Sequence, residues 1–448
     1  PRIENEIKEA VQSPPINKKK FQVTVVLTLS LVGQMSSWSI EAAMKIIFGI
    51  YISHSKILKI LNESAHIARD ILFSKLDLSC VKTSSFDEIF QSKSPMLGFV
   101  DNKSSIVFFK KADDRSSNSW SYFLGLLTSI GLNPSSVITD GGRGLKKSLH
   151  LEFGSSSIYT LDLFHFLKKL KEAKNKMEGI CYSLILKVDR IIKEKTDKRT
   201  SKYIEAIKKM NKAIDIFDSY EILLKKIANN VYLANENDDY TTSNELFEEF
   251  KDLAVYLKEF NVDIRRHRRI NEARSYLENN LKELTSYKAS IEADIKQKFK
   301  SNDSLILKQV VPIIEYYDRF ERSYENKKSQ EHWAKKIIDA KNNALEFMSK
   351  DDFDKNLNEV SEIVSKYAKS NSLIENINNQ IRRFLDTYKS IPEWFCDLFS
   401  LYWNFRKFKR GKRKGFAPVE LLTNKKMEKN WLELILEKFP FYKLQVAE

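Results

Sequence analysis

The segment 84–110 reads SSFDEIFQSKSPMLGFVDNKSSIVFFK, and it decides the fold class because its apolar residues come in short runs separated by turn residues. This pattern predicts one strand at residues 86–90. A hairpin follows, with strands at 96–100 and 106–109 and a turn at 101–104. Asp87 lies in the middle of the first strand beside aromatic residues. A charge in that position is costly unless something pairs with it, and a divalent metal would supply the pairing.

Helix and strand patterns alternate over the next fifty residues. We expect a helix, a strand, a second helix and a further strand, at about residues 120–130, 137–139, 145–149 and 157–161. The order β-β-β-α-β-α-β implies a mixed sheet flanked by helices, which is an α/β core. Asp140 ends a strand in SSVITDGGRG, where open sheets place ligand sites, although a lone Asp-Gly after a strand is more often a turn.

After residue 165 the strand patterns vanish, and the chain is rich in Lys, Glu, Ile and Leu up to about residue 369. Thr242 and Glu245 form a capping box before an amphipathic run, and further helices are predicted near 167–195, 199–216, 268–298, 304–324, 329–348 and 352–368. A structureless insertion of this length would be implausible. We therefore expect four parts: an N-terminal helical domain at 1–80, the first part of the core at 84–165, an all-helical insertion at 166–369, and the second part of the core with a basic tail at 370–448.

The N-terminal part predicts three helices, near 21–32, 40–48 and 54–76, and the last two are joined by a short turn that ends in the N-cap residue Ser53. Helix, turn and helix in this order are typical of helix-turn-helix DNA-binding domains, and Lys56 and Lys59 would then lie toward the DNA groove. An ordinary three-helix bundle gives the same pattern, so both interpretations stay open.

Composition narrows the class of partner. The chain has 448 residues and a formal net charge of +15, with a pI of about 9.3. Such an excess of positive charge indicates a polyanionic partner, usually nucleic acid, rather than a membrane. The longest apolar run, residues 21–32, is shorter than the roughly 20 residues of a bilayer span. Three scattered cysteines and six histidines give no zinc-ligand spacing.

A third acidic residue, Glu375, begins the amphipathic segment NSLIENINNQIRRFL. An apolar stripe of isoleucine, phenylalanine and leucine adjoins a polar face formed by Glu375, Asn378, Asn379 and Arg382. A carboxylate backed by amides and an arginine could hold a metal and grip phosphate, although such a face is more often merely solvated. Asp101 is the rival to Asp87 as the first carboxylate, but its place in the turn has a backbone reason.

Together these segments resemble DDE-type insertion-sequence transposases. The order DEIF, hairpin, GLxPxxVITDG is similar to theirs, and Asp162-x-x-His165 looks like a motif of the Mutator-like and hAT-like members. Those families also carry a helical insertion before the glutamate, and the segments NSxIENxNxxIR and RGKRKGFAPVELL look like their glutamate helix and tail. The resemblance covers residues 84–165 and 371–422.

The resemblance implies an RNase H-like core in which Asp87, Asp140 and Glu375 are catalytic and bind two Mg²⁺ ions, with Mn²⁺ as a substitute. Such a pair of ions would activate water to cut the transposon end and then align the freed 3′-OH for attack on target DNA. Asp162 and His165 would support the metal ligands or touch DNA. Trp333 is the candidate for stacking on a flipped base, although a core tryptophan is the more common case.

Clusters of Lys and Arg supply the expected contacts with double-stranded DNA: Arg265, Arg266, Arg268, Arg269, Arg406, Lys409, Arg410, Lys412, Arg413 and Lys414. Paired-end chemistry implies a homodimer or higher oligomer, acting in a bacterial nucleoid, or in a nucleus if the source is eukaryotic. A catalytically inactive relative that only binds DNA is the main alternative. A helical scaffold whose acidic matches are coincidental is the third.

Overall fold

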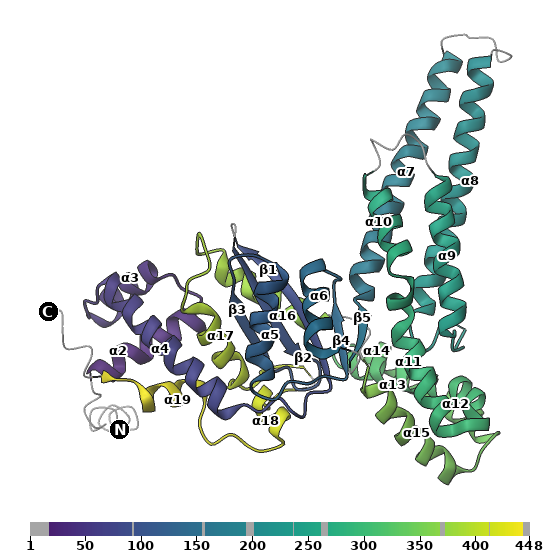
Figure 1. Ribbon diagram of the computed structural model, residues 1–448. Coiled ribbons are helices and arrows are strands. Elements are labelled where there is room, and N and C mark those ends of the chain that lie inside the picture. Colours follow the sequence, from purple (N-terminus) through teal and green to yellow (C-terminus); the bar gives the residue numbers. More distant parts are fainter. Residues whose placement is uncertain are drawn as a thin grey trace, which may run out of the picture. The chain divides into compact units, whose positions relative to one another are not determined.

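The computed structural model describes residues 18–91, 94–154, 157–193, 201–235, 237–260, 268–367, 372–411 and 413–441. Within these ranges the chain is mostly helical and contains one five-stranded mixed sheet, of strand order β3-β2-β1-β4-β5 (Figure 1). The α/β character predicted from the strand and helix patterns is therefore present. Two compact units make up the chain: the first comprises Pro1–Pro134, Gly142–Ser156 and Ser372–Glu448, and the second Ser135–Gly141 and Ser157–Asn371.

Three antiparallel strands of the first unit confirm the predicted strand and hairpin. β1 (Thr83–Gln91) pairs with β2 (Ser94–Asp101), and β2 pairs with β3 (Val107–Lys111). The register places Gly98 opposite both Asp87 and Phe109. A Cβ on Gly98 would lie 2.7 Å from the Phe109 ring, so only glycine lets this ring lie across β2.

Helix α17 (Phe395–Asn404) packs on the edge strand β3, and all of its residues except Asp397 are buried. The Asn404 side chain accepts a hydrogen bond from Val107 N and donates one to Val107 O, both at 2.8 Å, and Ser400 Oγ accepts from Phe109 N at 3.1 Å. An uncovered edge would present unpaired backbone groups to other chains. Side chains of α17 satisfy them instead.

The remaining helices of the first unit pack around these elements. The N-terminal helices α2 (Lys18–Leu31), α3 (Ser37–Phe48) and α4 (His54–Lys75) contact one another, and α19 (Trp431–Lys438) packs on α2 and α4. Helices α5 (Ser117–Thr128) and α6 (Arg143–Phe153) pack together, α16 (Ser372–Leu385) lies on β1 and β2, and α18 (Pro418–Thr423) contacts α17.

The second unit begins with two parallel strands, β4 (Ser136–Thr139) and β5 (Ile158–Leu161). The long helices α7 (Leu163–Lys193) and α8 (Ser201–Asn230) pack side by side (Figure 1), and the unit continues with α9 (Ser243–Glu259), α10 (Arg268–Asn279), α11 (Leu281–Phe299), α12 (Asp303–Gln309), α13 (Val311–Arg322), α14 (Lys327–Leu345) and α15 (Lys350–Ser365). The capping box of Thr242 and Glu245 is confirmed. The single helices predicted at 268–298 and 304–324 are each two helices, the second pair because Pro312 lies in the first turn of α13.

Candidate active site

Asp87 lies on β1 and is only 8% exposed. Its Oδ1 accepts a hydrogen bond from the backbone N–H of Glu88 at 2.8 Å, and its Oδ2 accepts one from Asn378 Nδ2 at 2.7 Å. A buried carboxylate that accepts hydrogen bonds keeps its charge at a lower cost. The second donor is 291 residues away in the sequence. It reaches Asp87 because α16 packs against β1.

The sequence of α16 explains how it presents this amide. Its apolar stripe is buried, and it consists of Ile374, Ile377, Ile381, Phe384 and Leu385. Asn378 is 1% exposed, whereas Glu375, one turn earlier on the same face, is half-buried. Asn379 and Arg382 are exposed and bond to each other at 2.7 Å. Of the predicted polar face, Asn378 thus contacts Asp87.

The amide oxygen of Asn378 differs from the amide nitrogen in its hydrogen bonding. Asn378 Oδ1 is buried and has no hydrogen-bond partner in the described part of the chain. Reversing the amide would not help, because two acceptors would then face each other at Asp87. A buried acceptor of this kind is usually satisfied by an ordered water or by a ligand.

A second acidic group lies in the second unit. Asp140 follows β4 and Asp162 follows β5, so the parallel pairing brings both acids to the carboxyl ends of neighbouring strands. Asp162 is fully buried, accepts from Phe164 N at 2.8 Å, and lies 3.8 Å from His165 Nε2. Its bond to the first turn of α7 is a helix-capping role, which by itself accounts for an aspartate here.

Tyr276 on α10 is a residue that the sequence reasoning missed. Its hydroxyl donates to the backbone O of Asp140 at 3.2 Å. Burial raises the pKa of Tyr276, and the negative charges of Asp140 and Asp162 raise it further. No sequence signal marks this residue, because it is 136 positions from its partner.

Gly141 shapes the turn that carries Asp140. Its φ is +83°, in the left-handed region that favours glycine, and its N–H donates to Thr139 Oγ1 at 3.0 Å. A Cβ at this position would lie 3.0 Å from Leu161 and 3.6 Å from the Tyr276 hydroxyl. The glycine is therefore needed both for the turn and for the close approach.

The donor chemistry around Asp87 fits a hard cation. Carboxylate and amide oxygens are the ligands that Mg²⁺ prefers, and the carboxylate of Asp87 and the buried Oδ1 of Asn378 are oxygens of this kind. Within the described ranges, no group of three or more His, Cys, Asp or Glu side chains is arranged to hold a metal ion. The predicted Mg²⁺ cofactor stays a prediction.

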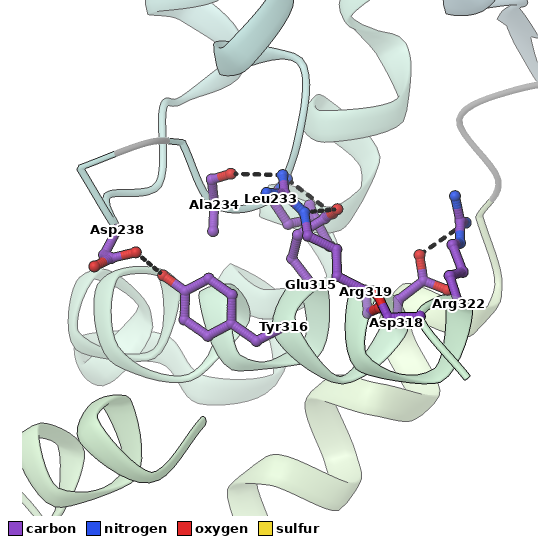
Figure 2. Close-up of polar contacts among 9 residues, drawn as sticks. Leu233, Ala234, Asp238, Glu315, Tyr316, Asp318, Arg319 and Arg322 are labelled. Atoms are coloured by element: carbon purple, nitrogen blue, oxygen red, sulfur yellow. Dashed lines mark hydrogen bonds and ion pairs between the residues drawn. The ribbon is translucent and has the colours of Figure 1, made fainter. Parts of the chain in front are cut away.

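The predicted Trp333 packs into a small core of the second unit. Its ring stacks on Tyr316 with centroids 6.0 Å apart, and the Arg319 guanidinium lies 4.9 Å from it. Figure 2 shows how Tyr316 and Arg319 are held, by Asp238 and by Glu315 and Ala234 respectively. Trp333 is partly buried and packs against this small core, so its contacts resemble the more common alternative, and its stacking on a DNA base stays a prediction.

The basic residues fall into distinct settings. Lys59 is exposed on α4 and Lys56 is partly buried there, and His54 beside them bonds to Ser37 at 2.8 Å. Arg268 and Arg269 are exposed at the start of α10, where Arg268 pairs with Glu272 at 3.0 Å. Three predicted residues lie outside the described part of the chain: Arg265, Arg266 and Lys412.

The basic tail divides in the same way. Lys409, Arg410 and Lys414 are exposed, whereas Arg406 and Arg413 are partly buried and bonded to neighbouring groups. Burial lowers the pKa of Arg413, while the nearby Asp101 acts in the opposite direction. The tail thus offers both free cations and cations held in place.

No protein-family model matches this chain, and no curated protein sequence matches it significantly. A search of the described helices finds none that is both long and apolar enough to cross a bilayer.

Proposed function

We propose that the chain is a DDE-type DNA transposase, in which Asp87, Asp140 and Glu375 serve a metal-dependent cleavage and strand-transfer reaction. One observation carries the proposal: the hydrogen bond of Asn378 to Asp87, one helical turn from Glu375. Two segments of the resemblance, 291 residues apart in sequence, meet at this bond.

The sheet supports the same proposal at the level of fold. Three antiparallel strands followed in the chain by two parallel ones, in the order β3-β2-β1-β4-β5, agree with the arrangement expected of an RNase H-like core. Fold alone does not imply activity, so the argument for function rests on the acidic residues.

Each side chain has a role in the proposal. Asp87 and Glu375 would hold Mg²⁺ on the first unit, with Asp140 as the third ligand. A bound Mg²⁺ would lower the pKa of water and neutralise charge on the phosphate. Asn378 is a positioning residue, because its Nδ2 fixes the rotamer of Asp87 and its Oδ1 can accept from an ordered water. Asp162 and His165 would position the turn that bears Asp140.

The partner in the proposal is double-stranded DNA, which the net charge of +15 and the exposed cations of the tail support. Action on two transposon ends would require a homodimer or larger assembly. The expected location is with the DNA, in a nucleoid or a nucleus.

A cleavage assay tests the proposal. A supercoiled plasmid that carries the genomic DNA flanking the coding sequence is incubated with the full chain in Mg²⁺, in Mn²⁺ or in EDTA. We expect nicked and linear products that depend on the metal and disappear in Asp87→Asn and Glu375→Gln. Asp386→Asn, an exposed acid just after α16, is the matched control and should cleave normally. DNA binding without cleavage under any of these metals would favour the inactive DNA-binding alternative.

A further inference from the structure

A small cavity lies in the first unit between α16, the end of α17 and the basic tail. Its volume is about 220 Å³, and its described lining includes Ser105, Gln380, Trp403, Arg406, Arg410 and Arg413. No acidic side chain is among the described lining residues. The cavity is therefore suited to an anion.

Two of the arginines are held in fixed positions. The Arg406 guanidinium lies 4.2 Å from the centre of the Trp403 ring and donates to Tyr402 Oη at 2.9 Å and to Gln380 Oε1 at 3.3 Å. Arg413 donates to the carbonyls of Asn102 and Lys103, both at 3.0 Å. Held guanidinium groups lose less freedom when they bind an anion than mobile lysines do.

Ser105 gives an independent indication of a ligand. It is fully buried, its φ is +67°, and its hydroxyl has no hydrogen-bond partner in the described part of the chain. Its carbonyl accepts from Trp403 Nε1 at 3.0 Å, which fixes the residue in this conformation. Left-handed backbone at a residue other than glycine is uncommon, and such strain gathers at binding sites. An unpartnered donor at the wall of a basic cavity is suited to an anionic oxygen.

We propose that this cavity binds one phosphodiester group of a nucleic-acid strand, through Ser105, Arg406, Arg410 and Arg413. The volume is below the roughly 300–1,000 Å³ of typical small-molecule sites, so it suits a phosphate and part of its sugar rather than a free nucleotide. Trp403 and Phe408 form an apolar part of the wall, and the exposed Lys409 and Lys414 extend the positive charge beyond the cavity. The inference rests on the proposed function only in taking nucleic acid as the partner, since no catalytic carboxylate takes part.

Binding of a fluorescein-labelled 20-mer, single-stranded and duplex, tests the inference by anisotropy with the full chain in EDTA. Arg410→Gln should weaken binding about tenfold or more and lower the slope of log affinity against log salt by about one. Ser105→Ala should weaken binding roughly ten- to hundredfold, the value of one hydrogen bond to a charged oxygen, and leave that slope unchanged. Lys409→Gln removes a neighbouring charge outside the described lining and is the matched control, with a smaller loss than Arg410→Gln.

Two further arms make the result decisive. Ser105→Gly removes the hydroxyl but relieves the backbone, so it should lose the same affinity as Ser105→Ala, with circular dichroism confirming the fold of both. The inference is overturned if both serine variants bind as wild type, if Lys409→Gln is as damaging as Arg410→Gln, or if inorganic phosphate alone binds the cavity as tightly as the 20-mer does. Because EDTA prevents cleavage, this inference and the proposed nuclease chemistry can fail separately.

Discussion

Asp87 and Asp101 are both buried aspartates of the same β1–β2 pair, yet the donors that bond to them differ in how far away they lie in the sequence. Asp101 accepts from Lys103 N at 3.2 Å, from Ser104 N at 2.8 Å and from the Ser104 hydroxyl, all within three residues. Asp87 accepts one local bond, from Glu88 N at 2.8 Å, and a second from Asn378, 291 residues away, whose Oδ1 has no partner in the described part of the chain. A locally satisfied acid builds a turn, whereas the acid that is also held by a remote, incompletely satisfied amide is the one that we propose binds a ligand.

The largest expected effect separates the two aspartates in catalysis. Asp87→Asn and Glu375→Gln should lower the initial rate of Mg²⁺-dependent plasmid nicking by roughly a thousandfold, about 4 kcal/mol of barrier, because each would remove a proposed metal ligand. Asp101→Asn should leave the rate per folded molecule unchanged. Equal loss of rate in Asp87→Asn and Asp101→Asn would break the comparison.

Removal of the remote amide should have a smaller effect. Asn378→Ala leaves Asp87 without its donor from α16, and we expect a loss of about 10–100-fold in activity or metal affinity. The rate is measured as a function of Mg²⁺ concentration, so that weaker metal binding appears as a shift of the midpoint. Asn379→Ala, at the exposed neighbouring position, is the control and should titrate as wild type. A midpoint that stays put in Asn378→Ala would contradict a positioning role.

Stability should show the reverse order. Asp101→Asn loses charge-assisted bonds from three donors and should lower the free energy of unfolding by about 1.5–3 kcal/mol in urea denaturation. Asp87→Asn keeps an oxygen that can accept from Asn378 and loses the bond from Glu88 N, so its loss should be smaller, about 1 kcal/mol. Larger destabilisation by Asp87→Asn would mean that Asp87 is mainly structural.

Gly98, which faces Asp87 in the register, gives the smallest test. Gly98→Ala places a methyl group 2.7 Å from the Phe109 ring and should cost about 1–3 kcal/mol of stability. Gly125→Ala in α5 meets nothing within 4 Å and should instead stabilise by about 0.5–1 kcal/mol. Equal shifts of the thermal midpoint in the two variants would show that the packing between β2 and β3 is loose.

Local patterns in the sequence predicted much of this architecture. The hairpin, the capping box of Thr242 and the apolar stripe of α16 depend on neighbours within a few residues, and each is present. The division of residues 268–298 into α10 and α11 was not predicted, because helical periodicity continues on both sides of Asn280.

The contacts that define the candidate sites could not be predicted from local patterns, because their partners are not neighbours in the sequence. Tyr276 against Asp140, Asn378 against Asp87, and Ser105 beside Trp403 join residues that are far apart in the chain. Only tertiary packing brings them together, and no residue type or spacing near either partner predicts the contact. The polar face of α16 was visible in the sequence, but not which of its members is buried.

The most direct test of the central claim is a crystal structure of the full chain soaked with Mn²⁺, with anomalous data collected at the manganese edge. The account predicts a peak within about 2–2.5 Å of carboxylate oxygens of Asp87 and Glu375, with Asn378 still bonded to Asp87. Well-ordered Asp87 and Glu375 side chains with no manganese between them, at the Mn²⁺ concentration of the cleavage assay, would contradict it.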